Sequence, residues 1–357
     1  MIPVTKTFFP PKIDFEKQIT RIWDNEWLTN SGKLYLELSD KLKKYLNVNN
    51  ILPMTNGTLP IQIALKVYGN QGEIITTPFS YVATTSSIAW ENCIPVFVDI
   101  HPEYLTIDET KIEAAITSKT TAILATHVYG NPCNVELIQE IANKYNLKVI
   151  YDGAHCFGVN YKDTSIFNYG DVSTCSFHAT KLFHTGEGGS LFCNDSKSLH
   201  KLTYSHNFAH NGTEEYFGLG INAKMSELQA AMGLCVLPYM EHIKKERKRV
   251  CDYYNQNLKF DYYKKIKIRE GTDWNYSYYP IIIKSEELLL EILAELALID
   301  VFPRRYFFPS LENLPYIVSK KSCYIADDIA KRVLCLPLYT SITSNELSVI
   351  CKLINKK

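Results

Sequence analysis

A chain of 357 residues is long enough for two domains, each with a core of its own. Lysine plus arginine number 38, as do aspartate plus glutamate, and this balance without a charge run argues against nucleic acid as a partner. Hydrophobic residues make up 46% of the chain, in stretches shorter than the roughly 20 residues of a membrane span, so a soluble globular protein with no membrane partner is expected.

Residues 51 to 193 alternate between short apolar stretches and helical patterns. The apolar stretches predict strands at 73–77, 95–99, 121–127, 148–151, 173–177 and 190–193. Helical spacing predicts helices at 109–116 and at 135–145, where Asn134 can cap the first turn. Such alternation favours a largely parallel sheet with helices on both faces, which binds ligands beyond the carboxyl ends of its strands.

The C-terminal third of the chain has a different pattern. A long helical pattern from about residue 223 to 254 predicts a connection between two domains. We place the large domain, with the N-terminal segment, at 1–240 and a smaller C-terminal α/β domain at 241–357. In the smaller domain a strand is expected at 278–283, with helices at 285–299 and 344–354.

Lys181 is the most informative single residue. It follows the strand predicted at 173–177 and precedes the glycine-rich turn Gly186-Glu-Gly-Gly189. A strand end presents a side chain to a ligand, and glycines let a flat cofactor approach the backbone. An amine in this position can form a Schiff base with a carbonyl, as the lysine that anchors pyridoxal phosphate (PLP) does, and can then act as acid and base in turn.

Two further groups suit the same cofactor. The strand predicted at 148–151 ends in Asp152, and a carboxylate there would keep the pyridinium nitrogen of PLP protonated. His155 lies three residues on and could reach the phenolate oxygen. The plainer alternatives are an aspartate that caps the next helix and a histidine with a structural role.

The sequence also offers a phosphate site and a stacking surface. Gly57 and Thr58 precede a helical pattern, and the free N–H groups of a helix N-terminus bind phosphate. Ser176 could add a hydroxyl. Tyr81 opens another helical pattern and could stack on the pyridine ring. A simple helix start and an ordinary core aromatic are the alternative interpretations.

Other site chemistries do not fit the spacing of the residues. The nine histidines form no metalloprotease pair and the ten scattered cysteines form no Cys-x-x-Cys, so no metal is expected. Gly186-Glu-Gly-Gly189 lacks the Gly-x-Gly-x-x-Gly spacing of a nicotinamide site. The N-terminal residues show no signal pattern and the cysteines suit reduced core thiols, so the expected location is the cytoplasm.

Ten segments spread over nearly the whole chain form a recognisable set. They are Trp27-Leu-Thr-Asn-Ser-Gly32, Asn56-Gly-Thr58, Thr77-Pro-Phe-Ser-Tyr81, His127-Val-Tyr-Gly-Asn-Pro132, Tyr151-Asp-Gly-Ala-His155, Ser176-Phe-His-Ala-Thr-Lys181, Gly186-Glu-Gly-Gly189, Gly220-Ile-Asn222-Ala-Lys-Met-Ser-Glu-Leu-Gln-Ala-Ala231, Arg305-Tyr-Phe-Phe-Pro309 and Leu336-Pro-Leu338. In this order they resemble the DegT/StrS-type nucleotide-sugar aminotransferases. The resemblance implies the fold type I architecture of PLP-dependent aminotransferases: a large domain with a mostly parallel sheet between helices, and a smaller C-terminal domain.

The resemblance also implies roles for individual residues. The catalytic group is Lys181, Asp152 and His155, and the other cofactor contacts are Gly57, Thr58, Tyr81, Ser176 and Asn222. The asparagine matches one that reaches the cofactor phosphate of the neighbouring subunit, which implies a homodimer with shared active sites. Two departures stand out, because Gly153 follows the aspartate where alanine is usual and Lys224 stands where arginine is common.

Lysine at position 181 implies amino transfer, because relatives that dehydrate sugars carry histidine there. The N-terminal segments are most similar to members that move nitrogen from L-glutamate to C4 of dTDP-4-keto-6-deoxy-D-glucose. Their product, dTDP-4-amino-4,6-dideoxy-D-glucose, serves surface polysaccharides such as the O-antigen of lipopolysaccharide. Amination at C3, a UDP- or GDP-linked keto-sugar, and a non-catalytic PLP-binding regulator are the alternatives. Candidates for stacking on the nucleotide base are Trp27, Tyr216, Trp274 and Tyr306.

Overall fold

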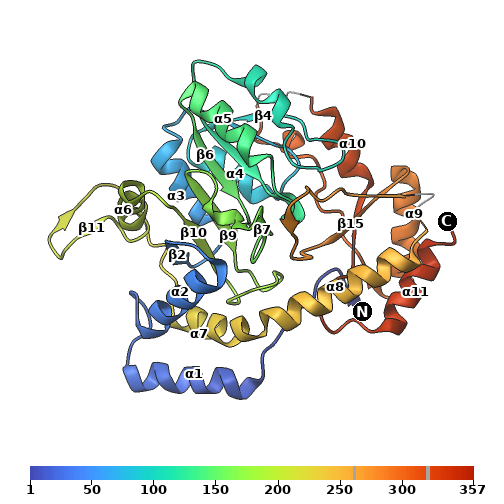
Figure 1. Cartoon of the computed structure of the whole chain (residues 1–357), viewed down its shortest axis with the longest axis horizontal. Coiled ribbons are helices and arrows are strands. Elements are labelled where there is room, and N and C mark those ends of the chain that lie inside the picture. Colours follow the sequence, from blue (N-terminus) through green and yellow to red (C-terminus); the bar gives the residue numbers. More distant parts are fainter. Residues whose placement is uncertain (260–262, 319–321) are drawn as a thin grey trace.

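The computed structural model describes residues 1–259, 263–318 and 322–357. Its centre is a seven-stranded sheet in the order β2-β10-β9-β6-β5-β3-β4 (Figure 1). These strands are β2 (Ile51–Met54), β3 (Glu73–Thr76), β4 (Ile94–Phe97), β5 (Thr120–Thr126), β6 (Lys148–Asp152), β9 (Val172–Ser176) and β10 (Gly189–Phe192). All neighbours from β4 to β9 pair in parallel, and β10 is antiparallel to both of its neighbours. The largely parallel sheet predicted from the sequence is therefore confirmed.

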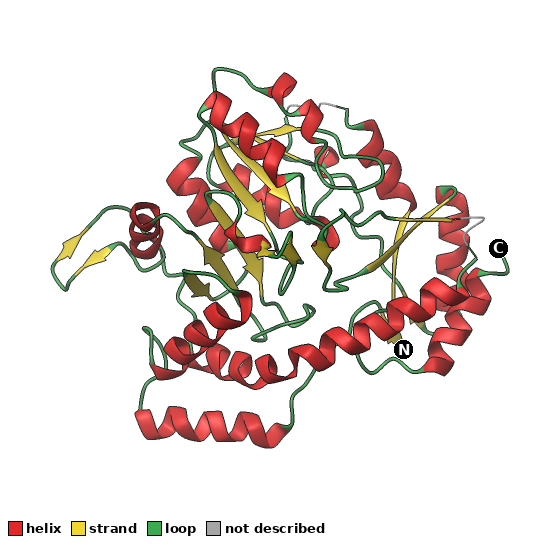
Figure 2. Ribbon diagram, in the orientation of Figure 1, coloured by secondary structure: helices red, strands yellow, loops and turns green. Residues whose placement is uncertain are grey.

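Helices cover both faces of this sheet (Figure 2). Successive residues of one strand enter different cores: Ile123 and Val149 belong to one hydrophobic cluster, and Leu124 and Ile150 to another. The helices that close the two clusters are α2 (Lys33–Leu46), α5 (Val135–Tyr145) and α7 (Glu227–Val236) on one face, and α3 (Leu59–Tyr68) and α4 (Val82–Trp90) on the other. Burial on both faces explains why apolar residues such as Ile123 and Leu124 follow one another directly within a strand.

Two helix predictions were wrong in part. Residues 109–116 form two short 3-10 turns, η1 (Glu109–Lys111) and η2 (Glu113–Ala115), and the backbone is already extended at Ile116 (φ -73, ψ 133), so the segment ends before a longer helix forms. The pattern from 223 to 254 is not one helix. A capping box at Ser226 starts α7, and the 3-10 turn η5 (Leu237–Tyr239), with Pro238 in its first turn, precedes α8 (Met240–Asn257).

The C-terminal part has its own core around the sheet β13-β15-β17. Its strands are β13 (Tyr263–Lys265), β15 (Tyr279–Ile283) and β17 (Val333–Leu336), and its helices include α9 (Glu286–Ala297), α10 (Tyr324–Arg332) and α11 (Ser344–Ile354). The predicted strand at 278–283 and the helix at 344–354 are confirmed. The N-terminal strand β1 (Ile2–Pro3) pairs with β16 (Val301–Phe302) of this part. A division at residue 240 remains a prediction.

The smaller helices and strands complete the chain. They are α1 (Lys12–Asn25), η3 (Val128–Gly130), β7 (Asn160–Tyr161), β8 (Thr164–Ser165), η4 (Ile166–Asn168), α6 (Ser196–Ser205), β11 (His210–Asn211), β12 (Glu215–Tyr216), β14 (Thr272–Asp273) and η6 (Leu311–Asn313). The hairpin β11-β12 protrudes from the body (Figure 1). Within the described residues, no helix combines the length and the apolar character that crossing a membrane requires.

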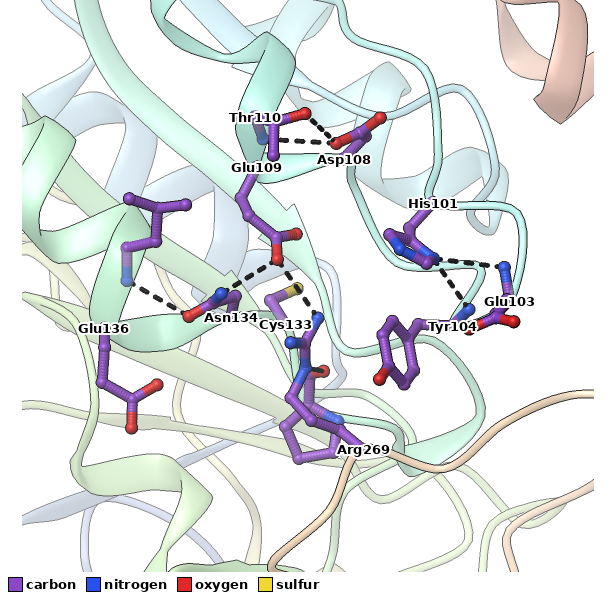
Figure 3. A network of polar contacts seen from close by, with 12 residues as sticks. His101, Glu103, Tyr104, Asp108, Glu109, Thr110, Cys133, Asn134, Glu136 and Arg269 are labelled. Atoms are coloured by element: carbon purple, nitrogen blue, oxygen red, sulfur yellow. Dashed lines mark hydrogen bonds and ion pairs between the residues drawn. The ribbon is translucent and has the colours of Figure 1, made fainter.

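A largely buried ion pair joins the two parts of the chain (Figure 3). The Arg269 guanidinium lies 3.5 Å from Glu109 Oε1, which also accepts a hydrogen bond of 2.9 Å from Asn134. Arg269 Nε donates to the Pro132 carbonyl at 3.0 Å, and the guanidinium stacks 4.5 Å from the ring centre of Tyr104. This network holds the loop between β5 and α5 against the segment that leads to β15.

We expect Glu109→Ala to destabilise the fold by about 3 kcal/mol, because it leaves the Arg269 charge buried without its partner. Urea unfolding followed by circular dichroism measures the change. The matched control is Glu113→Ala in η2, whose ion pair with Lys144 lies at the surface and should matter little. Equal unfolding midpoints for the two variants would contradict the assignment of Arg269 and Glu109 as a stabilising buried pair.

Candidate active site

A cavity of about 240 Å³ opens at the carboxyl edge of the central sheet. Asp152 is the last residue of β6 and Ser176 the last of β9, while Gly57 and Thr58 lie between β2 and α3. The parallel strands end together, so segments far apart in the sequence meet here. The predicted cofactor contacts that line this cavity are Gly57, Thr58, Tyr81, Asp152, His155, Ser176 and Lys181.

Lys181 presents its amine to the cavity. Its Nζ donates a hydrogen bond of 3.4 Å to the Tyr278 hydroxyl and lies 5.8 Å from the centre of the same ring. Burial lowers the pKa of Lys181, against a smaller opposing effect from nearby tyrosines and Asp152. A lowered pKa increases the neutral fraction of the amine, which is the form that attacks a carbonyl or accepts a proton.

Asp152 is 4% exposed and is held by neutral donors. Thr84 Oγ1 donates to its Oδ2 at 2.7 Å and the Ala154 N–H donates to its Oδ1 at 3.1 Å. Burial nevertheless raises the pKa of Asp152. Among the described residues this carboxylate forms no ion pair, so a cation placed beside it, such as a protonated ring nitrogen, would stabilise its charged form.

His155 has a defined tautomer. The Tyr129 N–H donates to His155 Nδ1 at 3.1 Å, so in the neutral ring the proton resides on Nε2. Burial, and next the charge of Lys181, hold the pKa of His155 well below its usual value, so the ring stays neutral. The ring stacks on Phe307 at a centroid distance of 5.7 Å. His155 is thus a neutral donor at the cavity wall.

The loop before α3 depends on a close backbone approach. A Cβ at Gly57 would lie 2.8 Å from the Ser176 Cβ, so only glycine lets the two segments meet. The N–H groups of Thr58 and Leu59 both donate to Asn56 Oδ1 at 2.9 Å. The expectation of free helix N–H groups is therefore wrong for these two, and of the predicted phosphate contacts the hydroxyls of Thr58 and Ser176 can still donate to an anion.

Tyr81 lies at the rim of the cavity as the residue before α4, with 53% of its surface exposed. Its ring faces Phe307 at a centroid distance of 6.4 Å. An exposed ring at the rim can cover a flat ligand, which suits the stacking role expected for it.

Gly153, where the resemblance led us to expect alanine, has a local reason. A Cβ at this position would lie 2.8 Å from the Thr174 carbonyl oxygen and 2.9 Å from the Phe167 ring. Here the packing of this chain requires glycine.

Asn222 lies apart from the other predicted residues. Within the described chain it is exposed and does not line the cavity. Its Oδ1 accepts a hydrogen bond of 2.8 Å from Lys224, which also donates to Asn207. A role at the site would therefore require a second subunit.

The four candidates for stacking on the nucleotide base differ in whether they line the cavity. Tyr306 lines the cavity, whereas the Trp274 indole donates to the Tyr129 carbonyl at 2.8 Å. Trp27 and Tyr216 are exposed on the surface of the single chain and are not among the described lining residues. Only Tyr306 is positioned to contact a ligand in the cavity of the same chain.

Several residues that contact the predicted site residues were not predicted from the sequence, among them Thr84, Tyr278 and Phe307. Thr84 donates a hydrogen bond to Asp152, and a signal was present, since Thr84 lies about one helical turn after Tyr81 in the helical pattern that Tyr81 opens. Tyr278 contacts Lys181 from a position 97 residues later in the chain. Nothing local in the sequence indicates that contact.

A half-buried lysine amine and a buried carboxylate at the carboxyl edge of this sheet are the pair of groups expected in a fold type I PLP-dependent enzyme. The profile of the DegT/DnrJ/EryC1/StrS aminotransferase family matches residues 12–355, and the chain belongs to this family. A dTDP-4-amino-4,6-dideoxy-D-glucose transaminase of Shigella dysenteriae is 40% identical over 359 residues, covering 99% of this chain and 98% of the relative. A transaminase of the same name from Escherichia coli is 38% identical, with 99% and 98% covered.

A solved structure agrees with this assignment. The crystal structure of DesI in the presence of its TDP-sugar product has a TM-score of 0.94 to this chain. The sequences are 26% identical, and the match covers 99% of this chain and 92% of that one. The fold of this chain is thus that of a sugar aminotransferase.

We expect Asp152→Asn to change the pH dependence of stability in the ligand-free protein. Burial raises the pKa of Asp152, so this group favours the folded state at low pH and loses that contribution as pH rises from about 4 through the raised pKa. Asparagine does not ionise. The Tm of Asp152→Asn minus the Tm of wild type should therefore increase as the pH rises over this range and then stay constant.

Thermal unfolding in steps between about pH 4 and pH 8 measures this difference. Hydrogen bonds lost with the carboxylate change the Tm of the variant by an amount that does not vary with pH. The test is therefore how the Tm difference changes with pH. The control is Asp163→Asn, the same change at an exposed turn. A Tm difference that is constant across the whole range would contradict the burial argument for Asp152.

Proposed function

We propose that this protein transfers an amino group from L-glutamate to C4 of dTDP-4-keto-6-deoxy-D-glucose and forms dTDP-4-amino-4,6-dideoxy-D-glucose. The observation that carries this proposal is the end-to-end similarity to two transaminases of that product name. The site supports it, because an amine and a carboxylate suited to PLP chemistry face one cavity.

The residues around the cavity fit PLP as the cofactor. When bound, PLP supplies an aldehyde that carries the amino group and a ring that withdraws electrons. We propose that the aldehyde attaches to Lys181 and that Asp152, which lacks a cationic partner in the described structure, binds the ring nitrogen. His155 would donate its Nε2–H to the phenolate. The remaining contacts are proposed for Gly57, Thr58, Ser176 and Tyr81.

Lys181 has a second task in this proposal. Once substrate has displaced it, its amine would accept a proton from the carbon that bears the amino group and deliver it to the carbon of the cofactor that carried the aldehyde. The lowered pKa of Lys181 suits this exchange, because it increases the fraction of neutral amine that can accept a proton. The neutral His155 beside it does not compete for the proton.

We also propose a homodimer in which Asn222 of each subunit completes the site of the other. Asn222 is exposed in the single chain, and the nearby hairpin carries apolar residues at its surface, including Phe217 and Leu219. All ten cysteines are buried thiols, which supports work in a reducing compartment such as the cytoplasm. The product would serve surface polysaccharide, of which O-antigen is one kind.

We expect Lys181→Ala to abolish formation of the amino sugar while the protein stays folded. The assay combines purified protein, PLP, L-glutamate and a panel of dTDP-, UDP- and GDP-linked 4-keto-6-deoxyhexoses, with NMR of the product. Wild type should place nitrogen at C4 of the dTDP-linked gluco substrate. Nitrogen at C3, or turnover by the alanine variant, would contradict the proposal.

We expect mixed dimers of Lys181→Ala and Asn222→Ala chains to recover activity that neither variant has. In a mixed dimer one site has both mutations and the other has neither, so random assembly should restore about a quarter of wild-type sites. Activity after the two variants are unfolded and refolded together measures this. Recovery that never exceeds the sum of the separate variants would argue against a shared site.

A further inference from the structure

Tyr278 lies directly before β15 and is 5% exposed. Its hydroxyl accepts the 3.4 Å hydrogen bond from Lys181 Nζ. In the part of the chain that the structure describes, this hydroxyl is the sole hydrogen-bond partner of the lysine amine, and it donates to no described acceptor of its own. A residue from the C-terminal part therefore contacts the amine of a residue in the loop between β9 and β10 of the central sheet.

The position of Tyr278 is fixed by its surroundings. The Tyr278 ring packs edge-to-face on His155 at a centroid distance of 4.9 Å and on Tyr306 at 5.3 Å. Three residues earlier, Asn275 Nδ2 donates to the carbonyls of His155 and Phe157 at 2.8 and 2.9 Å. These contacts thus fix the position of the Tyr278 hydroxyl relative to the His155 imidazole.

A lysine that moves protons needs such a partner. Its amine is carried on four rotatable methylene groups and, once released from a cofactor, has many positions available to it. A fixed hydroxyl selects the position from which a proton can be exchanged. Burial raises the pKa of Tyr278 above its ordinary value, so the hydroxyl acts as a neutral hydrogen-bond partner.

We propose that Tyr278 is a positioning residue for the aminotransferase reaction, whose hydroxyl holds the released Lys181 amine where it exchanges protons. The inference rests on the proposed function, since it assigns Tyr278 a part in the proton transfer carried out by Lys181. It adds a side chain from the C-terminal part to a site otherwise formed at the sheet edge.

The amine has other titratable neighbours. Those that act on Lys181 are Tyr81, Asp152, His155, Cys175 and Tyr306. A change confined to the hydroxyl of Tyr278 leaves all of them in place, and phenylalanine also keeps the ring that packs on His155. Any change in the pKa or the reactivity of the Lys181 amine is then due to the loss of the Tyr278 hydroxyl.

Tyr278→Phe is therefore the test variant, and the next residue supplies the control. Tyr279 is also 5% exposed, and its hydroxyl donates to Asn255 at 2.8 Å in the core of the C-terminal part. Tyr279→Phe removes the same atom from the neighbouring residue, the first of β15, which does not line the cavity. Matching circular dichroism and Tm values establish that both variants are folded.

The first readout needs no turnover. Ligand-free full-length protein is labelled with a trace of acetic anhydride over a pH series, and mass spectrometry of the peptide that contains Lys181 gives its apparent pKa. The Tyr278 hydroxyl accepts from the ammonium form, so its loss should lower the apparent pKa of Lys181 by roughly half a unit to one unit. The Tyr279→Phe profile should coincide with that of wild type.

The second readout follows the half-reaction of the PLP-loaded protein with L-glutamate by absorbance. For Tyr278→Phe we expect the saturating rate constant to fall about tenfold, the order of one lost hydrogen bond, at an unchanged half-saturating glutamate concentration. Tyr279→Phe should stay within about twofold of wild type.

The two readouts separate failure of this inference from failure of the proposed function. A Lys181 labelling profile that is the same in Tyr278→Phe and wild type overturns the positioning role, as does an unchanged rate constant or an equal effect in Tyr279→Phe. Wild-type protein that makes no amino sugar overturns the proposed function instead, and the labelling profile still reports the contact between Tyr278 and Lys181.

Discussion

The register of β6 between its two neighbours is the constraint on which the site depends. Asp152 pairs with Thr126 of β5 and with Thr174 of β9, and its carbonyl accepts the His127 N–H at 3.0 Å. Because side chains alternate between the faces of a sheet, a shift of one residue would turn the carboxylate to the opposite face. The same register brings Ser176, two residues beyond Thr174, to the edge where Gly57 packs against it.

The electrostatics of the site follow from that placement. Burial pushes Asp152 towards its protonated form and Lys181 towards its neutral form, so each group resists the charge it has in water. A cofactor with a cationic ring nitrogen and an aldehyde, as proposed, would give the carboxylate a partner and use the amine covalently. The same burial that makes the ligand-free groups unfavourable thus prepares them for their proposed roles.

The C-terminal part of the chain is a structural component of the site. Asn275 binds the backbone of His155 and Phe157, Trp274 binds the carbonyl of Tyr129, and Tyr278 reaches Lys181. Within the part that contains the central sheet, the Tyr129 N–H fixes the tautomer of His155. The imidazole and the amine are therefore oriented by contacts that cross from one part of the chain to the other.

The sequence by itself determined the parallel sheet, the helices at 135–145 and 344–354, and seven of the residues that line the cavity, because periodicity and strand ends are local properties. Only the tertiary structure decided which distant groups meet: Thr84 at Asp152, Tyr278 at Lys181, and the contact of Gly153 with Thr174 that excludes alanine. It also turned the pattern at 109–116 into 3-10 turns. The physical reason is that contacts between distant segments arise from tertiary packing. The number of residues between two distant positions does not show whether they meet in the folded chain.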